Sequence, residues 1–483
     1  MTSKIGGALA ALALCALAGT AVAQTSPSEL GRGAGGQPPV GGQPETSDKP
    51  SAPQTAPPSI ATSLPNPDPG GIRASLEARG VTYSLTYIGE VLGVASGGIR
   101  RGSIYQGRAD LQLDADLNKL IGWEGATVHA NVYQIHGRGL SRYYLANLLA
   151  TSGIEALPAT RLYELWLEQK FLDGKVAVRA GQLAADTEFL VSQYGALFVN
   201  GTFGWPGIAA ANLPAGGPAY PLATPGVRVK LQPTDELAIL AAIFNGNPSG
   251  YGPGDPQRNN RNGLEFRARD PALLVGEIQY SYNQAQDAAG LPGTVKLGAW
   301  HHLGRFDDLR FGADRLSLAD PESSGLARRF RGSSGVYAAL DQMVYRVPGT
   351  TDNGIGVFAR LSGSPGDRNL VSFYVDGGVT FKGFIPGRED DTFGVAFGYA
   401  RISDRARGFD LDAVAFSETL QPIRSSEAVI EATYQAQVLP GWTVQPDIQY
   451  VIRPGGNVAN PREPNGRATK NALVLGLRTT IRY

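Results

Sequence analysis

The sequence contains very little sulfur. Among its 483 residues there are two methionines and one cysteine, Cys15. Cys15 lies in an apolar run near the start of the chain, a run that we expect to be removed on export. The mature chain should then have no thiol, which excludes disulfide bonds and cysteine metal sites from its chemistry.

Long apolar runs are also scarce. An Ala/Leu-rich run extends from Ile5 to Ala18 after Lys4, and the small residues at 21–23 fit a cleavage site. This run is too short to cross a bilayer and has the order of a secretory signal peptide, which we assign to residues 1–23. No later run is long enough to form a membrane helix.

The chain lacks net charge. Lysine and arginine number 43, and aspartate and glutamate also number 43. Removal of Lys4 with the signal peptide leaves 43 − 1 = 42 basic residues against 43 acidic ones. A nearly neutral chain of this kind argues against nucleic acid as a partner.

Signatures of catalysis and cofactor binding are absent from the sequence. There is no Walker loop, no nucleophile-elbow pentapeptide and no zinc signature. His301 and His302 would point to opposite faces of a strand, and His129 and His136 also have opposite parity, so both are poor metal pairs. We therefore predict no catalytic residue, no metal and no cofactor. A serine, a histidine and an aspartate that converge only in space are the alternative.

Strict alternation of apolar and polar residues marks the end of the sequence. In the stretches 428–438, 442–453 and 473–483, nearly every second residue is apolar and those between are mostly polar. A soluble β-sandwich would cover the apolar face with a second sheet. The last strand instead ends on Tyr483, which is similar to the signal by which outer-membrane barrels are recognised for assembly. We therefore expect the apolar face to contact lipid.

The same alternation recurs along the chain and predicts about sixteen strands, an even number as in bacterial barrels. Charged residues in these strands should face the lumen, because a Lys or Arg facing lipid at mid-depth costs about 2 to 4 kcal/mol. Tyr163, for example, should face lipid and Glu164 the lumen. The predicted strands lie near 81–92, 104–117, 126–136, 161–171, 176–183, 226–231, 237–244, 272–283, 294–302, 335–345, 354–361, 370–381, 392–402, 428–438, 442–453 and 473–483.

The connections between the predicted strands alternate between short and long. Short turns at the periplasmic end and long loops at the extracellular end are the outer-membrane arrangement. The sequence therefore predicts an all-β fold, a single-chain antiparallel β-barrel of about sixteen strands in the outer membrane of a Gram-negative cell. The short connections include 172–174, 232–235 and 439–441, and the long ones include 137–160, 184–225, 304–334 and 403–425.

The region between the signal peptide and the first strand has a different composition. Residues 24–70 are rich in Pro, Gly, Ser and Gln and poor in large apolar residues, so we expect a disordered periplasmic segment. A docking site for cell-wall or protein partners is the alternative for this segment. Residues 71–80 predict a short helix, which begins a barrel domain over 71–483.

Several motifs resemble one protein family. Near the C-terminus they are Glu427, Glu431 and Tyr434, followed by 445–451 and 454–456; earlier ones are 96–98, 116–125, 137–141, 179–183 and 198–204. These stretches resemble the carbohydrate-selective porins of the OprB type and span nearly the whole predicted barrel. Pro446, inside one of them, has no N–H for the strand ladder, so we expect a local break there.

The resemblance implies an outer-membrane porin for passive diffusion of mono- and small oligosaccharides into the periplasm. The alternatives are a general or other-solute porin, a barrel enzyme and a surface adhesin. The implied partners are small sugars, outer-membrane lipids and, through Tyr483, the barrel assembly machinery. The oligomeric state, monomer or trimer, stays open.

Candidate solute-binding residues follow from the strand faces. A sugar ring exchanges its water for hydrogen bonds to carboxylates and guanidinium groups, and its C–H face lies against an aromatic ring. Each candidate is equally explained as part of a salt bridge across the lumen. The candidates for the pore lining are Arg108, Asp110, Glu164, Trp166, Arg179, Arg228, Arg360, Glu431 and Asp447, and those for a loop that narrows the pore are Phe198, Phe203 and Trp205.

Overall fold

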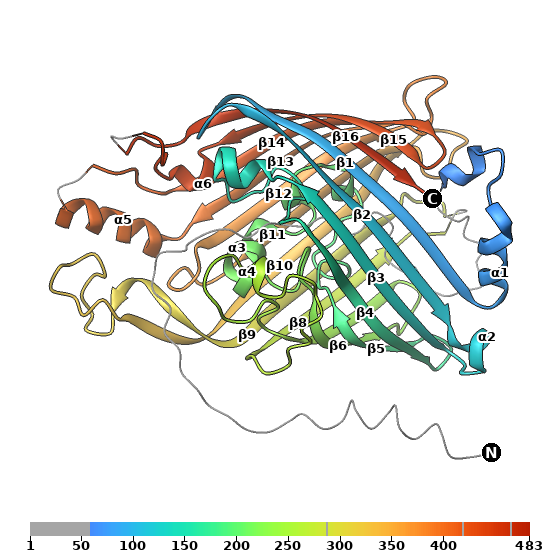
Figure 1. Cartoon of the computed structure of the whole chain (residues 1–483), viewed down its shortest axis with the longest axis horizontal. Helices are drawn as coiled ribbons and strands as arrows, with labels where there is room; N and C mark the ends of the chain where they lie inside the picture. Colours follow the sequence, from blue (N-terminus) through green and yellow to red (C-terminus); the bar gives the residue numbers. More distant parts are fainter. Residues whose placement is uncertain (1–57, 286–287, 418–419, 464–465) are drawn as a thin grey trace, which may run out of the picture. The chain divides into compact units, whose positions relative to one another are not determined.

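The computed structural model describes residues 58–285, 288–417, 420–463 and 466–483. Over this part of the chain, sixteen antiparallel strands form one closed sheet, in which each strand pairs with its sequence neighbours and β1 pairs with β16 (Figure 1). The predicted all-β barrel of sixteen strands is therefore confirmed. The predicted signal peptide, with Cys15, and residues 24–57 of the predicted disordered segment lie outside the described residues.

Every predicted strand has a counterpart in the barrel. Their bounds are β1 (Val81–Gly98), β2 (Gly102–Asp116), β3 (Ala126–Gly137), β4 (Ala159–Phe171), β5 (Val176–Leu183), β6 (Thr224–Leu231), β7 (Leu237–Asn245), β8 (Ala272–Tyr282), β9 (Gly293–Gly312), β10 (Ala327–Arg346), β11 (Gly354–Gly363), β12 (Val371–Lys382), β13 (Thr392–Ile402), β14 (Ser426–Leu439), β15 (Trp442–Ile452) and β16 (Lys470–Arg482).

The helices are short and lie in the connections and at the start of the barrel. No helix in the described ranges has the length and apolar character needed to cross a bilayer. Their bounds are α1 (Ile72–Ala78), α2 (Leu117–Ile121), α3 (Gly207–Asn212), α4 (Pro256–Asn259), α5 (Asp404–Ser417) and α6 (Pro454–Asn457), with 3-10 turns η1 (Ile60–Ser63), η2 (Pro69–Gly71), η4 (Gly195–Leu197), η5 (Gly201–Phe203) and η6 (Pro214–Gly216) and a π-helical turn η3 (Ser141–Leu145).

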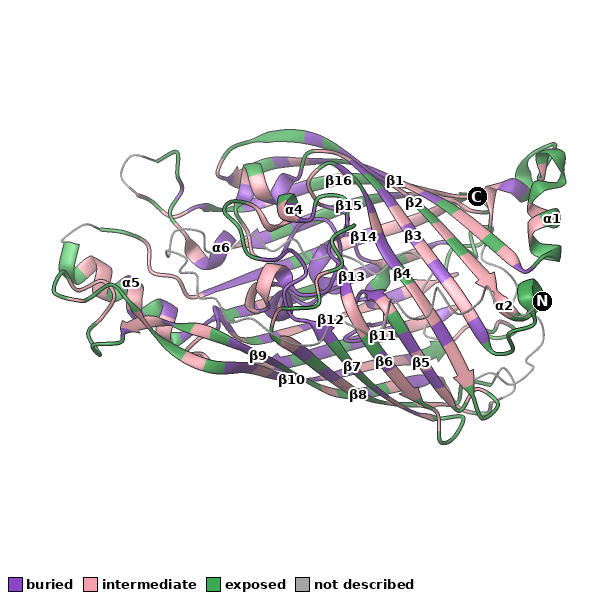
Figure 2. Ribbon diagram, turned by 60° about the horizontal axis from the view of Figure 1, so that its bottom comes forward, coloured by how far each residue is buried: buried purple, intermediate pink, exposed green. Residues whose placement is uncertain are grey.

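Burial alternates along the strands as their sequences predict. On β16, Leu475 and Leu477 are 48% and 50% exposed, whereas Val474 is fully buried. Figure 2 shows the same alternation of exposed and buried residues on many strands of the wall. Large apolar residues are exposed along most strands, so the outward surface of the barrel suits lipid contact.

One residue of β4 departs from the predicted alternation. Tyr163 was expected to face lipid, but it is fully buried. Asn131 on β3 pairs with Glu164, while the next residue, Val132, pairs with Leu162, so Tyr163 is the extra residue of a β-bulge. A bulge inserts one residue into the strand and reverses the alternation locally, which turns Tyr163 inward beside Glu164.

The expected break at Pro446 is confirmed on one side of β15. The ladder with β14 runs from Ala428 to Thr433, resumes at Ala436, and has no pair in between. On the other side, Pro446 pairs in register with Leu477 of β16. The missing N–H of proline therefore interrupts the ladder with β14 and leaves the strand itself continuous.

One predicted long loop, 304–334, is wrong. Pairing of β9 with β10 continues from Arg305 with Arg331 to Gly312 with Ala327, so the true connection is much shorter. Gly332 has a φ of +75° and lies at a register shift between paired residues. It thus serves a bulge, where a left-handed backbone favours glycine.

The outward face can be tested on β16. Replacing lipid-facing Leu475 with Arg should lower the free energy of unfolding by about 2 to 4 kcal/mol, because the charge would face hydrocarbon. Thr480 lies on the opposite, lumen-facing side of the same strand, so Thr480→Arg should change it little. Urea unfolding in lipid vesicles measures both, and equal effects would contradict the assignment of faces.

Candidate functional site

Two long connections, 138–158 and 184–223, fold back into the lumen (Figure 1). The rings of Phe198 and Phe203 lie with centroids 5.8 and 6.1 Å from that of Phe358 on the inward face of β11. Both phenylalanines and Trp205 are at most 2% exposed and belong to one apolar core with inward-facing wall residues. These three aromatics therefore fill the interior of the barrel and offer no open ring face to a solute.

Carboxylates on the wall bind the backbone of the two connections. Glu431 on β14 accepts hydrogen bonds from the N–H groups of Val199 and Asn200 at 2.6 and 2.9 Å. Glu427, four residues earlier on the same inward face of β14, accepts hydrogen bonds from the N–H groups of Leu148 and Leu149 at 2.8 and 2.7 Å. Irregular backbone has no ladder partner, so these charged acceptors satisfy donors that would otherwise be buried unpaired.

Arg360 on β11 serves the carbonyl groups of the second connection. Its guanidinium donates to the carbonyl oxygens of Leu190 at 2.7 Å, Phe203 at 2.8 Å and Thr202 at 2.9 Å. Its Nε also donates to Asp376 on β12 at 3.0 Å. Arg360 is 1% exposed, so this pore-lining candidate is buried between the wall and the connection and links the two by hydrogen bonds.

Two further candidates, Arg179 and Arg228, belong to a charge network on β4, β5 and β6. Glu168 accepts from Arg179 at 3.0 Å and from Arg228 at 2.8 Å. Glu188, at the start of the second connection, accepts from Arg179 at 2.8 Å. Burial opposes ionisation, but the Arg179 and Arg228 guanidiniums together lower the pKa of Glu188 to about 2. Glu188 therefore stays ionised at every physiological pH, and its ion pairs hold the start of the connection against the wall.

Trp166 is enclosed by its neighbours. The guanidinium of Arg179 on β5 lies 3.7 Å from the centre of its ring, and the ring of His129 on β3 stacks on it at 4.7 Å. Both contacts come from the strands on either side of β4. Trp166 therefore stacks against protein groups where an aromatic platform for sugar was predicted.

The remaining candidates are also buried. Arg108 and Asp110 are at most 1% exposed, and their closest charged atoms lie 3.7 Å apart. Glu164 accepts from the N–H of Ala184 at 2.9 Å, and Asp447 accepts from Gln449 at 2.8 Å. These four side chains face inward as predicted, and the second connection contacts Arg108 through Tyr220 and Glu164 through Ala184.

An open cavity of about 470 Å³ lies inside the short-turn end of the barrel. Tyr194 of the second connection lines it, and its ring lies so close to Gly356 that a Cβ there would be 2.1 Å from a ring carbon. The rest of the lining combines amide and hydroxyl groups with charged ones. The amide and hydroxyl residues are Gln193, Thr380, Thr392, Gln435, Gln437, Thr443, Gln445 and Thr480, and the charged residues are Asp352, Lys382, Arg478 and Arg482.

The cavity residues were not among the sequence-based candidates, which were charged or aromatic side chains. A signal for some of them existed, because Gln435 and Gln437 have the same strand parity as Glu431. No comparable signal marks Tyr194, since its position depends on how the connection folds. Within the described ranges, no group of three or more His, Cys, Asp or Glu residues lies close enough to hold a metal ion.

Asp186 anchors the second connection next to its entry into the lumen. It accepts hydrogen bonds from the N–H of Tyr220 and from the hydroxyl of Tyr163, both at 2.8 Å. Burial raises the pKa of Asp186 to about 7, although both hydrogen bonds favour the carboxylate. This anchor therefore changes charge near neutral pH, in contrast to Glu188 of the same connection.

Comparison with known proteins decides the family. The family model described as carbohydrate-selective porin, OprB family, matches residues 100–483. The chain belongs to the OprB family of carbohydrate-selective porins. The family and the fold make it a passive carbohydrate channel of the outer membrane, and they indicate a channel rather than an enzyme.

Known proteins are similar to this chain over most of its length. Porin B of Pseudomonas aeruginosa is 25% identical over 438 residues, which cover 85% of this chain and 89% of that protein. The high-pH structure of Pseudomonas putida OprB has a TM-score of 0.76 at 23% identity and covers 86% of this chain and 97% of that one. The low-pH structure of the same protein has a TM-score of 0.52 at 18% identity. These structures share the barrel fold.

The Asp186 anchor predicts a pH dependence. The folded-state pKa of about 7 exceeds the ordinary 3.8, so the stabilisation by Asp186 is complete below about 3.8 and is lost as pH rises through about 7. Hydrogen exchange of the Tyr220 region, corrected for intrinsic rates, should therefore quicken as the pH rises from about 4 to about 7 and change little above pH 7. Asp186→Asn should abolish this dependence.

Glu188→Gln is the matched control for that experiment. Glu188 stays ionised throughout the same pH range, so its amide variant should retain the pH dependence of the parent. A pH profile that is flat in the parent chain, or unchanged in Asp186→Asn, would contradict the role of Asp186.

Proposed function

We propose that this porin conducts mono- and small oligosaccharides into the periplasm through the cavity that Tyr194 lines. The observation that carries the proposal is the composition of this cavity. Its volume of about 470 Å³ is bounded largely by amide and hydroxyl groups together with one tyrosine ring. The predicted charged candidates of the lumen wall are buried, so a solute meets these neutral groups together with the other charged residues of the lining, Asp352, Lys382, Arg478 and Arg482.

The chemistry of these groups suits a sugar. Glutamine side chains both donate and accept, as sugar hydroxyls do, so they replace the water shell of a ring without favouring an ion. Tyr194 lies against the bare backbone of Gly356, which supports its ring as a flat apolar surface for the C–H face of a pyranose. Neutral contacts of this kind are weak enough for the solute to leave, as conduction requires.

The charged candidates of the wall support the connection that borders the passage. Arg360 and Glu431 hold the connection that carries Tyr194, and Arg179 and Arg228 fix its beginning. We propose that they set the width of the passage instead of binding sugar directly. Arg108, Asp110, Glu164, Trp166 and Asp447 take the same supporting role.

The proposal includes export and assembly. A signal peptide over 1–23 would deliver the chain to the periplasm, where residues 24–70 would form a spacer at the short-turn mouth. The closing strand would be recognised through Tyr483. In support, the Tyr483 N–H donates to the carbonyl of Leu85 on β1 at 2.8 Å, which places this aromatic at the seam where the barrel closes.

Liposome swelling tests the function. D-glucose should enter proteoliposomes faster than an amino acid of matched size. Tyr194→Ala should reduce the preference about threefold to tenfold, since an aromatic contact contributes roughly 1 kcal/mol. Tyr251→Ala is the matched control, because Tyr251 lies in a loop and is 70% exposed.

The outcomes of this experiment are distinct. Equal rates for sugar and amino acid in the parent chain would favour a general porin. An absence of swelling would remove the channel. If Tyr194→Ala retains the preference for sugar over amino acid, the channel function stands but Tyr194 does not contact the solute.

A further inference from the structure

A second cavity lies outside the lumen, at the long-loop end of the barrel. It has a volume of about 550 Å³ and is lined by three arginines, Arg310, Arg401 and Arg405. Phe373 of β12 and two carboxylates, Asp367 of the β11–β12 connection and Asp404 of α5, also line it. The channel function assigns no role to this group of residues.

The cavity opens on the lipid-facing side of the wall. Phe373 on β12 pairs with Arg401 on β13, so the two side chains lie next to each other on one face. Their strand neighbours Tyr374 and Ala400 are fully buried and point inward, whereas Phe373 is 38% exposed. Phe373 and Arg401 therefore point away from the lumen.

The cavity also lies where the apolar belt of β13 ends. The outward residues of this strand are Phe393, Val395, Phe397 and Tyr399, and the next outward residue is Arg401. A change from aromatic to cationic side chains marks the boundary between hydrocarbon and headgroups in membrane proteins. Arg401 therefore lies at the height of the lipid headgroups.

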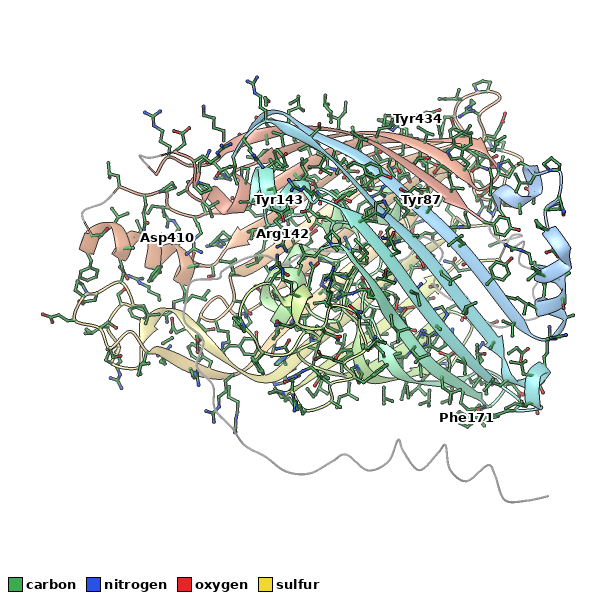
Figure 3. The ribbon with its side chains drawn as sticks, in the orientation of Figure 1. Tyr87, Arg142, Tyr143, Phe171, Asp410 and Tyr434 are labelled. Atoms are coloured by element: carbon green, nitrogen blue, oxygen red, sulfur yellow. The ribbon has the colours of Figure 1, made fainter. Side chains whose placement is uncertain are left out.

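The elements around the cavity are held firmly. Arg310 on β9 donates through Nε and an NH2 nitrogen to both oxygens of Asp412 on α5, at 2.7 and 2.9 Å. At Gly408 of α5 a Cβ would lie 2.6 Å from the Arg310 guanidinium, so this side chain packs directly against the glycine of the helix. Asp410 on the same helix, labelled in Figure 3, binds Arg424 at 2.8 Å. The pocket is thus preformed between α5 and the wall.

Positive charge in the pocket is available to a ligand. Arg401 pairs with Asp404 at 2.9 Å, but the two side chains are 53% and 81% exposed, and such surface pairs contribute little. Arg405 lies over the ring of Phe311 at 4.6 Å and forms no salt bridge in the part of the chain that the structure describes. Asp367 accepts hydrogen bonds through both oxygens from Arg368, which is outside the cavity lining, although its charge also interacts with that of Arg405. Arg401 and Arg405 can therefore both bind an anion.

We propose that this pocket binds the phosphate-bearing headgroup of an anionic lipid in the outer leaflet. Arg401 and Arg405 bind the phosphate oxygens by charge-assisted hydrogen bonds, and the acyl chain lies along Phe373. A membrane lipid is the occupant because the pocket combines cations with an exposed apolar ring at headgroup height. The lipid fixes α5 and the neighbouring loop to the membrane surface.

Calorimetric titration of the folded full-length chain in zwitterionic detergent tests the proposal. The probes are dioctanoyl phosphatidylglycerol, phosphatidylcholine with the same chains, and inorganic phosphate. Phosphatidylglycerol should bind more tightly than the other two, and high salt should weaken it. Arg401→Gln with Arg405→Gln should raise its Kd roughly thirtyfold, since each arginine near a lipid surface contributes about 1 kcal/mol.

Two control variants separate charge from folding. Arg462→Gln with Arg467→Gln removes the same charge from exposed positions in the β15–β16 loop and should change the Kd by less than about twofold. Arg401→Lys with Arg405→Lys keeps the charge and should retain most of the affinity. Equal binding of the two lipids, equal binding of inorganic phosphate, or an unchanged Kd in the glutamine double variant would each overturn the proposal.

Discussion

Irregular backbone inside a barrel has to find hydrogen-bond partners, and this requirement organises the interior of the porin. The backbone groups of the strands form hydrogen bonds with neighbouring strands. The connections 138–158 and 184–223 lie inside the barrel and have no neighbouring strand to pair with. Such backbone is tolerated there only when protein groups or water satisfy it. Glu427, Glu431 and Arg360 supply those groups from the wall. Wall charges that resemble a pore lining are therefore the supports of an inner structure.

Glycine on the inward face of the wall gives the connections room. At Gly394 of β13 a Cβ would lie 2.6 Å from Leu197 and 2.9 Å from Phe198, and at Gly356 of β11 it would meet Tyr194. The strands thus alternate bulky outward residues with small or hydrogen-bonding inward ones. One face is selected for lipid, and the other is selected to fit a particular fold of the connections.

Much of the fold was predictable from the sequence, because the period of two fixes both the strands and their faces. The inward orientation of Tyr163 was not predictable, because alternation alone does not indicate where a β-bulge occurs. The roles of the site residues were not predictable for a different reason. Strand parity indicates that Arg360 faces inward, but it does not indicate whether water or a folded connection covers the side chain. Tyr194, on that connection, could only be placed once its fold was known.

The central claim is that the connection 184–223, held by the wall, sets the width of the channel. Single-channel conductance in planar bilayers tests it most directly, on the parent chain and on a variant in which residues 188–220 are replaced by a short glycine-serine linker. The account predicts a severalfold larger conductance for the variant, together with loss of discrimination between sugars and amino acids. A folded variant with the conductance of the parent would contradict it.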